Sequence, residues 1–213
     1  MTLSREVQER WSRMLQDADP RVQMEALTEI GRSYFHMESR GEEPLKEVFL
    51  GERAAVQVKG AAEPELPTSL RDAILNKLEA HDPSLRAEAV LALVHWRDEE
   101  TIDAIVERLK DSDSTVRLAA VQALATLREA ELIPDLLEVA RSDPEELVRA
   151  HALSALAQIP EEDIRNWEGK VAGAVRTRGG VTMPGYVTVL KQITERDSSR
   201  YVAFLAQKAL ERF

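Results

Sequence analysis

A helix-opening motif recurs along the chain at a nearly constant spacing, and this repeat constrains the fold more than any other feature. The stretch DPSLRAEAVLALVHW begins at Asp82, and the similar stretch DSTVRLAAVQALATL begins 31 residues later at Asp113. A third copy, DPEELVRAHALSALAQI, begins at Asp143 and has two extra residues before its Val-Arg pair. Asp19 and Asp197 begin weaker copies. A period of about 30 residues is typical of arrays in which each repeat is one supersecondary unit.

Each of these Asp residues is expected to open a helix. Aspartate is a preferred N-cap because its carboxylate accepts hydrogen bonds from the free N–H groups of the first turn. Pro20, Pro83 and Pro144 follow three of the Asp residues. Proline suits the first helical position, where the backbone N–H has no partner in any case. The motif therefore predicts five helices that begin directly after their Asp.

A further helix is predicted before each of these five, in the segments 4–16, 69–80, 100–110, 133–141 and 185–195. In the third of these segments Ile102, Ile105, Val106 and Leu109 follow the i, i+3, i+4, i+7 spacing of one helix face. Neither helix of a pair can bury its apolar face alone, so neighbouring pairs must stack. We therefore predict an all-α fold of about five helix pairs without a sheet.

The pattern Asp-x-x-Val-Arg-x-x-Ala-x-x-Ala-Leu within 98–127 resembles the short HEAT-like repeat, of the type also found in phycobilin lyases. The resemblance is clearest over 68–159. It implies a right-handed α-solenoid (an α–α superhelix) that forms a single HEAT-like domain over residues 1–213. Gln23 replaces the arginine of the motif in the first copy, and we expect the copies at both ends to act as caps of the array.

Two segments interrupt the period. The stretch 39–67 is rich in Gly and Pro and is either a decayed repeat or an insertion, for which we expect a short helix at 44–50 followed by a loop. The stretch 160–180 predicts one extra helix. Acidic residues lie at its start, Arg176 and Arg178 at its end, and glycines stop it.

The composition excludes several classes of function. The net charge of −10 disfavours nucleic acid as a partner, because phosphate contacts require an excess of Lys and Arg, whereas it permits a basic partner. The chain has no cysteine, which excludes disulfides, thiolate metal sites and a cysteine nucleophile. The first residues lack the apolar run of a secretory signal, and no apolar stretch approaches about 20 residues. We therefore expect a cytoplasmic protein without a membrane partner.

Side chains that could carry chemistry are sparse. The sequence contains no Gly-rich phosphate loop, no histidine pair with metal-ligand spacing and no nucleophile elbow, so we expect no cofactor, no metal and no catalytic residue. The repeated arginines, Arg86, Arg117 and Arg149, are expected to bind the Asp of their own or the next repeat, with an anionic ligand as the alternative.

Two further features have a structural and a functional interpretation. Trp11, Trp96 and Trp167 are expected to fill gaps between helices, with stacking on a ligand as the alternative. The locally basic stretch 165–178 either complements a helix end or meets an anionic partner.

The candidate binding surface is a polar stripe on the second helix of each pair. Positions six, nine and thirteen after the Asp cap share one helix face, and the resemblance places these helices on the concave side of the array. With the two extra residues after Asp143 allowed for, the polar stripe consists of Glu25, Thr28, Arg32, Glu88, Leu91, His95, Gln122, Thr126, His151, Ser154 and Gln158. A plain solvated face is the alternative.

These observations predict a monomeric, non-enzymatic scaffold or adaptor that binds another protein, in particular a basic one, on the concave face. Two alternatives remain open. The first is a bilin lyase-like chromophore chaperone, suggested by the repeat, and the second is an inhibitor or immunity protein for a basic partner. A HEAT-like DNA glycosylase is disfavoured by the net acidity.

Overall fold

The computed structural model describes residues 4–38, 67–170, 174–178 and 180–213. They form two compact units, Met1–Trp96 and Arg97–Phe213, each of which is described by itself. The expected helix at 44–50, with nearly all of the predicted interruption 39–67, lies outside the described residues. The assignment of the whole chain to a single domain stays a prediction.

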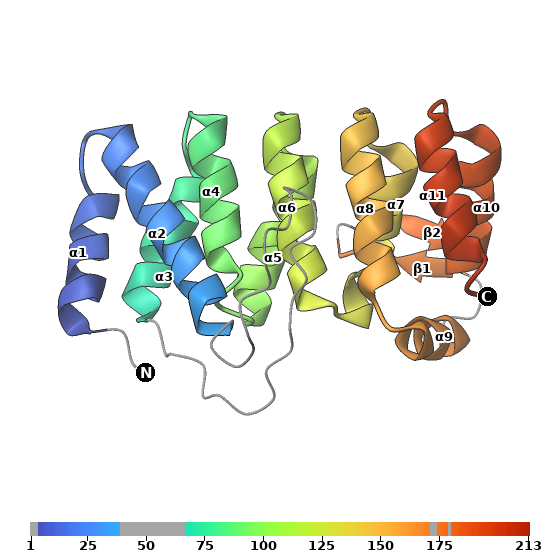
Figure 1. Ribbon diagram of the computed structural model, residues 1–213, viewed down its shortest axis with the longest axis horizontal. Coiled ribbons are helices and arrows are strands. Elements are labelled where there is room, and N and C mark those ends of the chain that lie inside the picture. Colours follow the sequence, from blue (N-terminus) through green and yellow to red (C-terminus); the bar gives the residue numbers. More distant parts are fainter. Residues whose placement is uncertain (1–3, 39–66, 171–173, 179) are drawn as a thin grey trace. The chain divides into compact units, whose positions relative to one another are not determined.

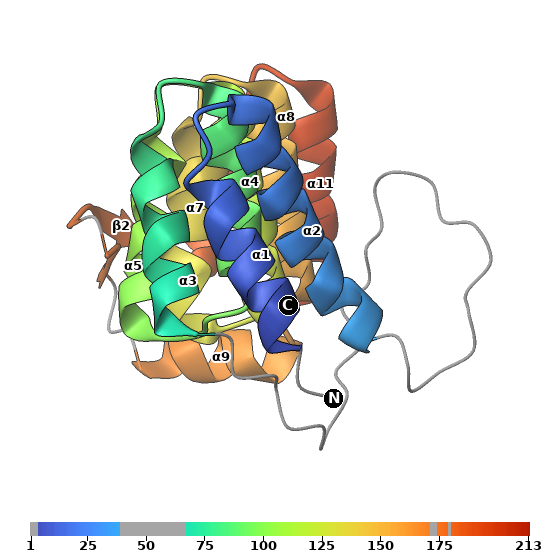
Figure 2. The ribbon, with the colours of Figure 1, turned by 90° about the vertical axis from the view of Figure 1, so that its left-hand side faces the viewer.

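The described residues of the first unit form two helix pairs. Helix α1 (Arg5–Leu15) pairs with α2 (Pro20–Glu38), and α3 (Thr68–Leu75), prolonged by the 3-10 helix η2 (Asn76–Glu79), pairs with α4 (Pro83–Leu93). The first helices of the two pairs lie side by side, and so do the second helices (Figure 2). The core between these two layers includes the buried side chains of Trp11, Leu27, Ile30, Leu70, Ile74, Val90 and Leu93.

In the second unit, the part of the chain that the structure describes forms three pairs. Helix α5 (Glu99–Glu107), prolonged by η3 (Arg108–Lys110), pairs with α6 (Ser114–Leu127). Helix α7 (Ile133–Ser142), preceded by η4 (Ala130–Leu132), pairs with α8 (Glu146–Gln158), and α10 (Tyr186–Arg196) pairs with α11 (Arg200–Leu210). Helices α6, α8 and α11 pack in one layer, and α7 and α10 lie behind them (Figure 1). The five predicted pairs are thus present within the described residues, and the all-α class is confirmed.

The segment 160–180 departs from the prediction of one extra helix. Helix α9 (Glu161–Lys170) accounts for its first half, but β1 (Ala174–Arg176) and β2 (Thr182–Pro184) then form a small antiparallel hairpin with Val175 opposite Met183. Gly180 has a φ of 83°, a conformation that favours glycine and suits a tight turn. The expectation of a fold without a sheet is therefore wrong at this hairpin, and Arg176 and Arg178 do not end a helix.

The helix caps follow the motif at three of its five copies. Asp82 and Asp113 cap α4 and α6, accepting hydrogen bonds from Ser84 N at 2.9 Å and Thr115 N at 2.8 Å, and α2 begins directly after Asp19. The predictions for Asp143, Asp197 and Pro144 are wrong, because α8 begins at Glu146 after the cap residue Glu145 and α11 begins at Arg200 after Ser199. Both mispredicted Asp residues lie two positions before the true cap.

This correction removes the apparent insertion in the third copy. Counted from the cap residues Asp113 and Glu145, Arg117 and Arg149 both lie four residues into their helices. The backbone N–H of Glu145 donates to Asp143 Oδ1 at 2.9 Å, and that of Asp113 donates to Asp111 Oδ1 at 2.9 Å. The Asp two positions before the cap therefore stabilises the turn in both repeats, while the cap position itself tolerates different residues.

Helix α6 shows why the motif is rich in alanine. Its buried residues lie on several faces because α5, η3 and α8 all pack against it, and they include Val116, Ala120, Ala123, Leu124 and Leu127. Leu124 is 1 % exposed, as its place in the Ala-Leu pair predicted. Small side chains allow neighbouring helices to approach closely, and the leucines fill the remaining space.

Candidate functional site

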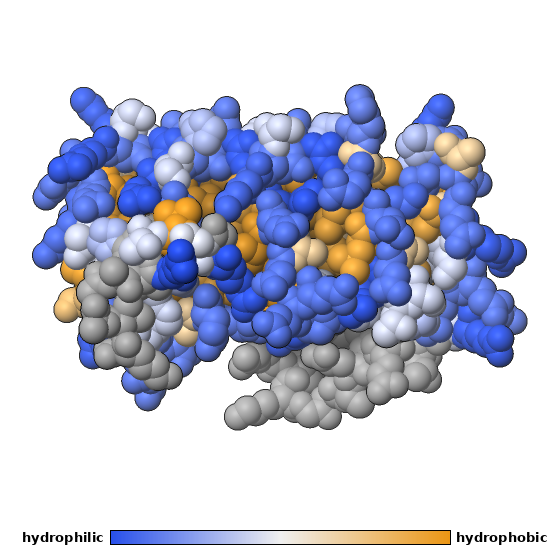
Figure 3. Space-filling model, turned by 180° about the vertical axis from the view of Figure 1, so that it is seen from behind, coloured by the Kyte–Doolittle hydropathy of each residue, from blue (hydrophilic) through white to orange (hydrophobic). Residues whose placement is uncertain are grey.

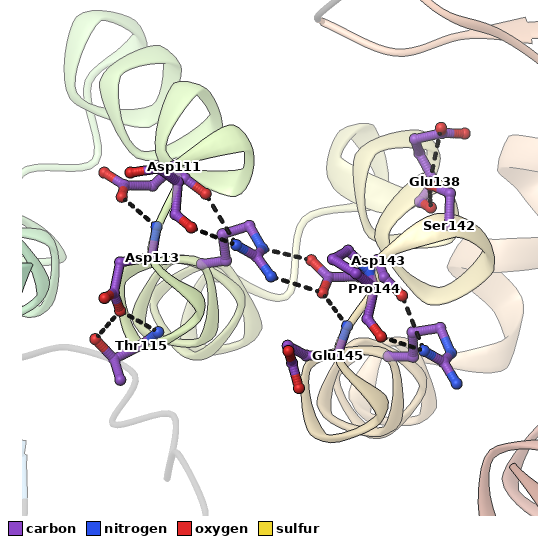
Figure 4. A network of polar contacts seen from close by, with 11 residues as sticks. Asp111, Asp113, Thr115, Glu138, Ser142, Asp143, Pro144 and Glu145 are labelled. Atoms are coloured by element: carbon purple, nitrogen blue, oxygen red, sulfur yellow. Dashed lines mark hydrogen bonds and ion pairs between the residues drawn. The ribbon is translucent and has the colours of Figure 1, made fainter.

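The repeated arginines hold consecutive turns of the second unit together, and Figure 4 shows the turn at Asp111 and Asp113 linked by dashed lines to the turn at Asp143 and Glu145. The guanidinium of Arg117 donates to both carboxylate oxygens of Asp143, at 2.7 and 3.1 Å, and to the carbonyl of Asp111 at 3.0 Å. Arg149 repeats this arrangement with Asp197, at 2.8 and 2.9 Å, and with the carbonyl of Asp143 at 2.9 Å. The predicted ladder is thus confirmed for these two arginines, and each binds the Asp of the following turn.

Because both ion pairs are buried, they stabilise the packing of the turns. The side chains of Arg117 and Asp143 are 10 % and 3 % exposed, and the hydrogen bond to Asp143 raises the pKa of Arg117 above its usual range. Burial by itself raises the pKa of Asp197, but hydrogen bonds from Arg149 and from the backbone of Ser199 outweigh it, so the pKa lies below its usual value. Neither arginine is therefore available to an anionic ligand in this conformation.

In the first unit the same helical position contacts the same backbone. Arg86 donates to the carbonyl of Ala80 at 2.9 Å, and Gln23 donates to the carbonyl of Asp17 at 2.5 Å. Both acceptors lie six residues earlier, as in the second unit. Gln23 therefore replaces the arginine in closing the turn, although it carries no charge.

The polar stripe of the first unit is partly occupied by contacts within the unit. Glu25 and Arg32 are exposed, and Thr28 Oγ1 donates to Glu88 Oε2 at 3.5 Å. The ring of His95 donates from Nε2 to the carbonyl of Ile30 at 3.0 Å, and burial lowers its pKa to about 4. A neutral ring that joins α2 to the turn after α4 stabilises the packing, which makes His95 a poor contact for a partner.

In the second unit the polar stripe lies on α6 and α8. Gln122, Ser154 and Gln158 are exposed, whereas Thr126 and His151 are half-buried. Several of the side chains bond to their own helix: Thr126 Oγ1 donates to Ala123 O at 2.7 Å, and His151 Nδ1 lies 2.8 Å from Leu147 O. Leu91 of the first unit is half-buried. The polar stripe offers mainly small polar groups, and its role as a binding surface stays a prediction.

A deeper surface lies between the first helices of the second unit. A cleft of about 820 Å³ is formed by α5, η3, α7 and the turn between β1 and β2. Its apolar residues are Val106, Leu109, Val139, Pro144 and Val181. Its charged residues are Glu99, Asp103, Glu107, Lys110, Asp111, Arg117, Asp135, Glu138, Asp143 and Arg178. We call this surface the α5–α7 cleft. Figure 3 shows the molecule from behind the view of Figure 1, where apolar surface is visible between hydrophilic residues.

The turn of the hairpin closes one side of the α5–α7 cleft. Arg178 Nη1 lies 2.5 Å from Asp103 Oδ1 of α5, and the backbone N–H of Arg178 donates to Asp135 Oδ1 of α7 at 3.0 Å. These contacts join positions 75 and 43 residues apart. Sequence reasoning missed this surface. The only signal was the locally basic stretch 165–178, in which Arg165 instead forms an ion pair with Glu161.

The expectation for the tryptophans can be compared with the geometry. Trp11 is 3 % exposed and donates from Nε1 to Glu29 Oε2 at 2.7 Å, so it is a core residue with its N–H bonded, and Trp96 and Trp167 are half-buried.

Among the residues that the structure describes, no cluster of three or more His, Asp and Glu side chains is arranged to hold a metal ion. None of the described helices combines the length and the apolar character needed to cross a bilayer.

Comparison with known proteins supports the repeat. Residues 71–157 match the sequence profile of HEAT repeats. No curated protein matches the chain.

Three solved structures resemble the fold. Two engineered proteins of the Northeast Structural Genomics Consortium are each 21 % identical, with TM-scores of 0.50 and 0.51, and the match covers 98 % and 96 % of this chain. The chain spans 47 % of the first of these proteins and 79 % of the second. A designed armadillo repeat protein is 19 % identical over 97 % of this chain and 85 % of its own, with a TM-score of 0.48. At such identities the two engineered proteins show a common helical repeat fold and nothing further.

Proposed function

Residues 71–157 belong to the HEAT repeat family, and on this premise we propose that the chain is a non-enzymatic scaffold that binds another protein. The observation that carries the proposal is the α5–α7 cleft, which combines an apolar floor with a charged rim. Protein interfaces have the same composition, with apolar side chains at the centre and polar side chains around them. A repeat array can present such a surface because its helices are held by the core and by the ion pairs of the turns.

The cleft fits this function better than the polar stripe does. Val106, Val139 and Val181 supply apolar surface beside carboxylates that a partner can contact. The polar stripe of the second unit instead exposes Gln122 and Ser154, while other members bond to their own backbone. Since most binding energy at interfaces comes from a few well-packed side chains, a concave, partly apolar surface is the stronger candidate.

Affinity capture with matched variants tests the proposal. The full chain is immobilised and exposed to a lysate of its source organism, and the retained proteins are identified by mass spectrometry. Asp103→Asn with Glu107→Gln removes two charges from the cleft with little change in shape. Gln122→Ala with Ser154→Ala alters the polar stripe at exposed positions, where such changes shift stability by only about 0.5 kcal/mol.

The expected result is a protein that the unmodified chain and the stripe variant retain and that the cleft variant loses. If the stripe variant loses the protein and the cleft variant keeps it, the working surface is the one expected from the sequence. If the unmodified chain retains no protein above an empty column, the scaffold function itself is wrong.

A further inference from the structure

We propose that the α5–α7 cleft recognises an extended, cationic segment of its protein partner, and that Arg178 occupies the cleft in the unbound chain as an internal substitute for that segment. The inference rests on the proposed scaffold function and adds the chemical class of the partner. It is carried by the charge of the cleft, by its size and by the position of Arg178.

The cleft is lined by more carboxylate than cationic side chains, and of the carboxylates Glu138 is also paired with Arg141 outside the cleft. Seven carboxylate side chains line it against three cationic ones. Of these three, Arg117 is held by Asp143 at 2.7 Å and Arg178 by Asp103 at 2.5 Å. Because the whole chain also has a net charge of −10, its field attracts cationic segments and repels acidic ones.

The size and floor of the cleft suit a stretch of a few residues. A volume of about 820 Å³ falls within the range of pockets that hold small ligands, about 300–1,000 Å³. It can receive several side chains but not a folded domain. Lysine and arginine place their aliphatic stems on apolar surface while the charged group reaches a carboxylate. Val106, Leu109 and Val139 supply that surface next to Asp103 and Glu107.

Arg178 shows that the cleft accepts a guanidinium group. Its ion pair with Asp103 is open to water, with side chains 30 % and 53 % exposed. Exposed pairs of this kind are weak, so a cationic side chain of a partner can replace Arg178 at Asp103. The pair of Arg117 with Asp143, at 10 % and 3 % exposure, lacks this freedom.

The turn that carries Arg178 does not depend on this ion pair. The backbone N–H of Thr177 donates to the carbonyl of Val181 at 2.8 Å, and the N–H of Val181 donates to Thr177 Oγ1 at 2.9 Å. The N–H of Gly180 donates to the carbonyl of Thr177 at 2.9 Å. The guanidinium can therefore leave Asp103 while the hairpin keeps its backbone hydrogen bonds.

Fluorescence anisotropy with a defined probe tests the inference. The probe is a fluorescein-labelled peptide, Gly-Arg-Val-Lys-Ala-Arg-Val-Lys-Gly, and its control has glutamine at all four cationic positions. Both are titrated with the full chain and with four variants. Asp103→Asn with Glu107→Gln removes two of the seven carboxylate charges of the cleft, and Glu162→Gln with Glu195→Gln removes the same charge at exposed positions outside it. Arg178→Ala and Arg178→Met remove the internal occupant, and the second keeps an aliphatic side chain on the hairpin.

The unmodified chain is expected to bind the cationic peptide and not the glutamine peptide. The cleft variant should bind at least about tenfold more weakly, whereas the charge-matched control should change less than about twofold. Both Arg178 variants should bind about two- to fivefold more tightly, the range that an exposed ion pair allows.

Three results would overturn the inference. An equal loss in the charge-matched control means that the peptide responds only to net charge. Unchanged or weaker binding by both Arg178 variants, with helix content retained in circular dichroism, means that Arg178 does not compete with the peptide. Absence of peptide binding, in a chain that still captures a protein from lysate through the cleft, refutes the cationic partner class while the scaffold function stands.

Discussion

Removing the arginine of the buried turn pair is expected to be among the most destabilising single changes in the second unit. In the unmodified chain the Asp143 side chain is 3 % exposed and accepts two guanidinium hydrogen bonds from Arg117, at 2.7 and 3.1 Å. Arg117→Met removes both hydrogen bonds and leaves the carboxylate in this buried place. The N–H of Glu145, at 2.9 Å, still donates to that carboxylate. Breaking one side of a buried ion pair costs about 3–5 kcal/mol, because the remaining charge is poorly solvated. We expect Arg117→Met to lower the free energy of unfolding by this amount.

A second change separates the cost of the stranded charge from the cost of lost packing. Adding Asp143→Asn to Arg117→Met removes the remaining charge while an amide oxygen still accepts from Glu145 N. The double variant should therefore recover at least about half of the lost stability, since buried pairs contribute less than their one-sided removal suggests. The exposed pair Lys208–Glu211, with side chains 55 % and 52 % exposed, provides a control. Lys208→Met should cost less than about 1 kcal/mol.

Urea unfolding at pH 7, followed by circular dichroism at 222 nm, measures these differences. With a slope near about 2 kcal/mol/M, Arg117→Met should lower the midpoint of the transition that involves the second unit by about 1.5–2.5 M. A loss no larger than that of Lys208→Met would refute the structural role of the pair. A double variant that is less stable than Arg117→Met alone would refute the stranded charge as the cause.

Three further outcomes are expected. Leu124→Ala, at a site 1 % exposed, should cost about 2–5 kcal/mol in the same urea assay, and a loss below about 0.5 kcal/mol contradicts its place in the core. The pKa of Asp197 is lower in the folded chain than its ordinary value of about 3.9. Its bond to Arg149 therefore contributes its full stabilisation above about pH 3.9, and this stabilisation is lost as the pH falls through the lower pKa of the folded state. The stability difference between the unmodified chain and Arg149→Met should therefore shrink below about pH 4, and a difference that stays constant down to pH 2.5 argues against the pair. The imidazole of His95 should titrate near pH 4 in NMR spectra, and stability should fall as the pH drops from 6.5 toward 4, because the unfolded chain then binds the proton first. Titration near 6.5, or an unchanged pH dependence in His95→Gln, contradicts the buried hydrogen bond to Ile30.

The sequence by itself determined the repeated helix pair and much of its core. An Asp cap followed by Ala, Leu and Val at helical spacing predicts a helix and its buried face from nearby residues alone, because capping and amphipathic periodicity act within a few residues. Asp82 and Asp113 accordingly cap the predicted helices, and Leu124 is buried. The pairing of the repeated arginines with Asp was also expected, since their spacing places both groups near the turns.

The tertiary structure decided which neighbour each group meets. Asp143 and Asp197 are aspartates like the cap residues, yet each lies two positions before the residue that caps its helix. There they accept hydrogen bonds from Arg117 and Arg149 of the preceding repeat. The α5–α7 cleft depends on contacts such as that of Arg178 with Asp103, across 75 residues, and no local pattern encodes such a contact. Chain propensity acts over a few residues, whereas a binding surface forms only when distant segments pack, so the repeat was predictable and the cleft was not.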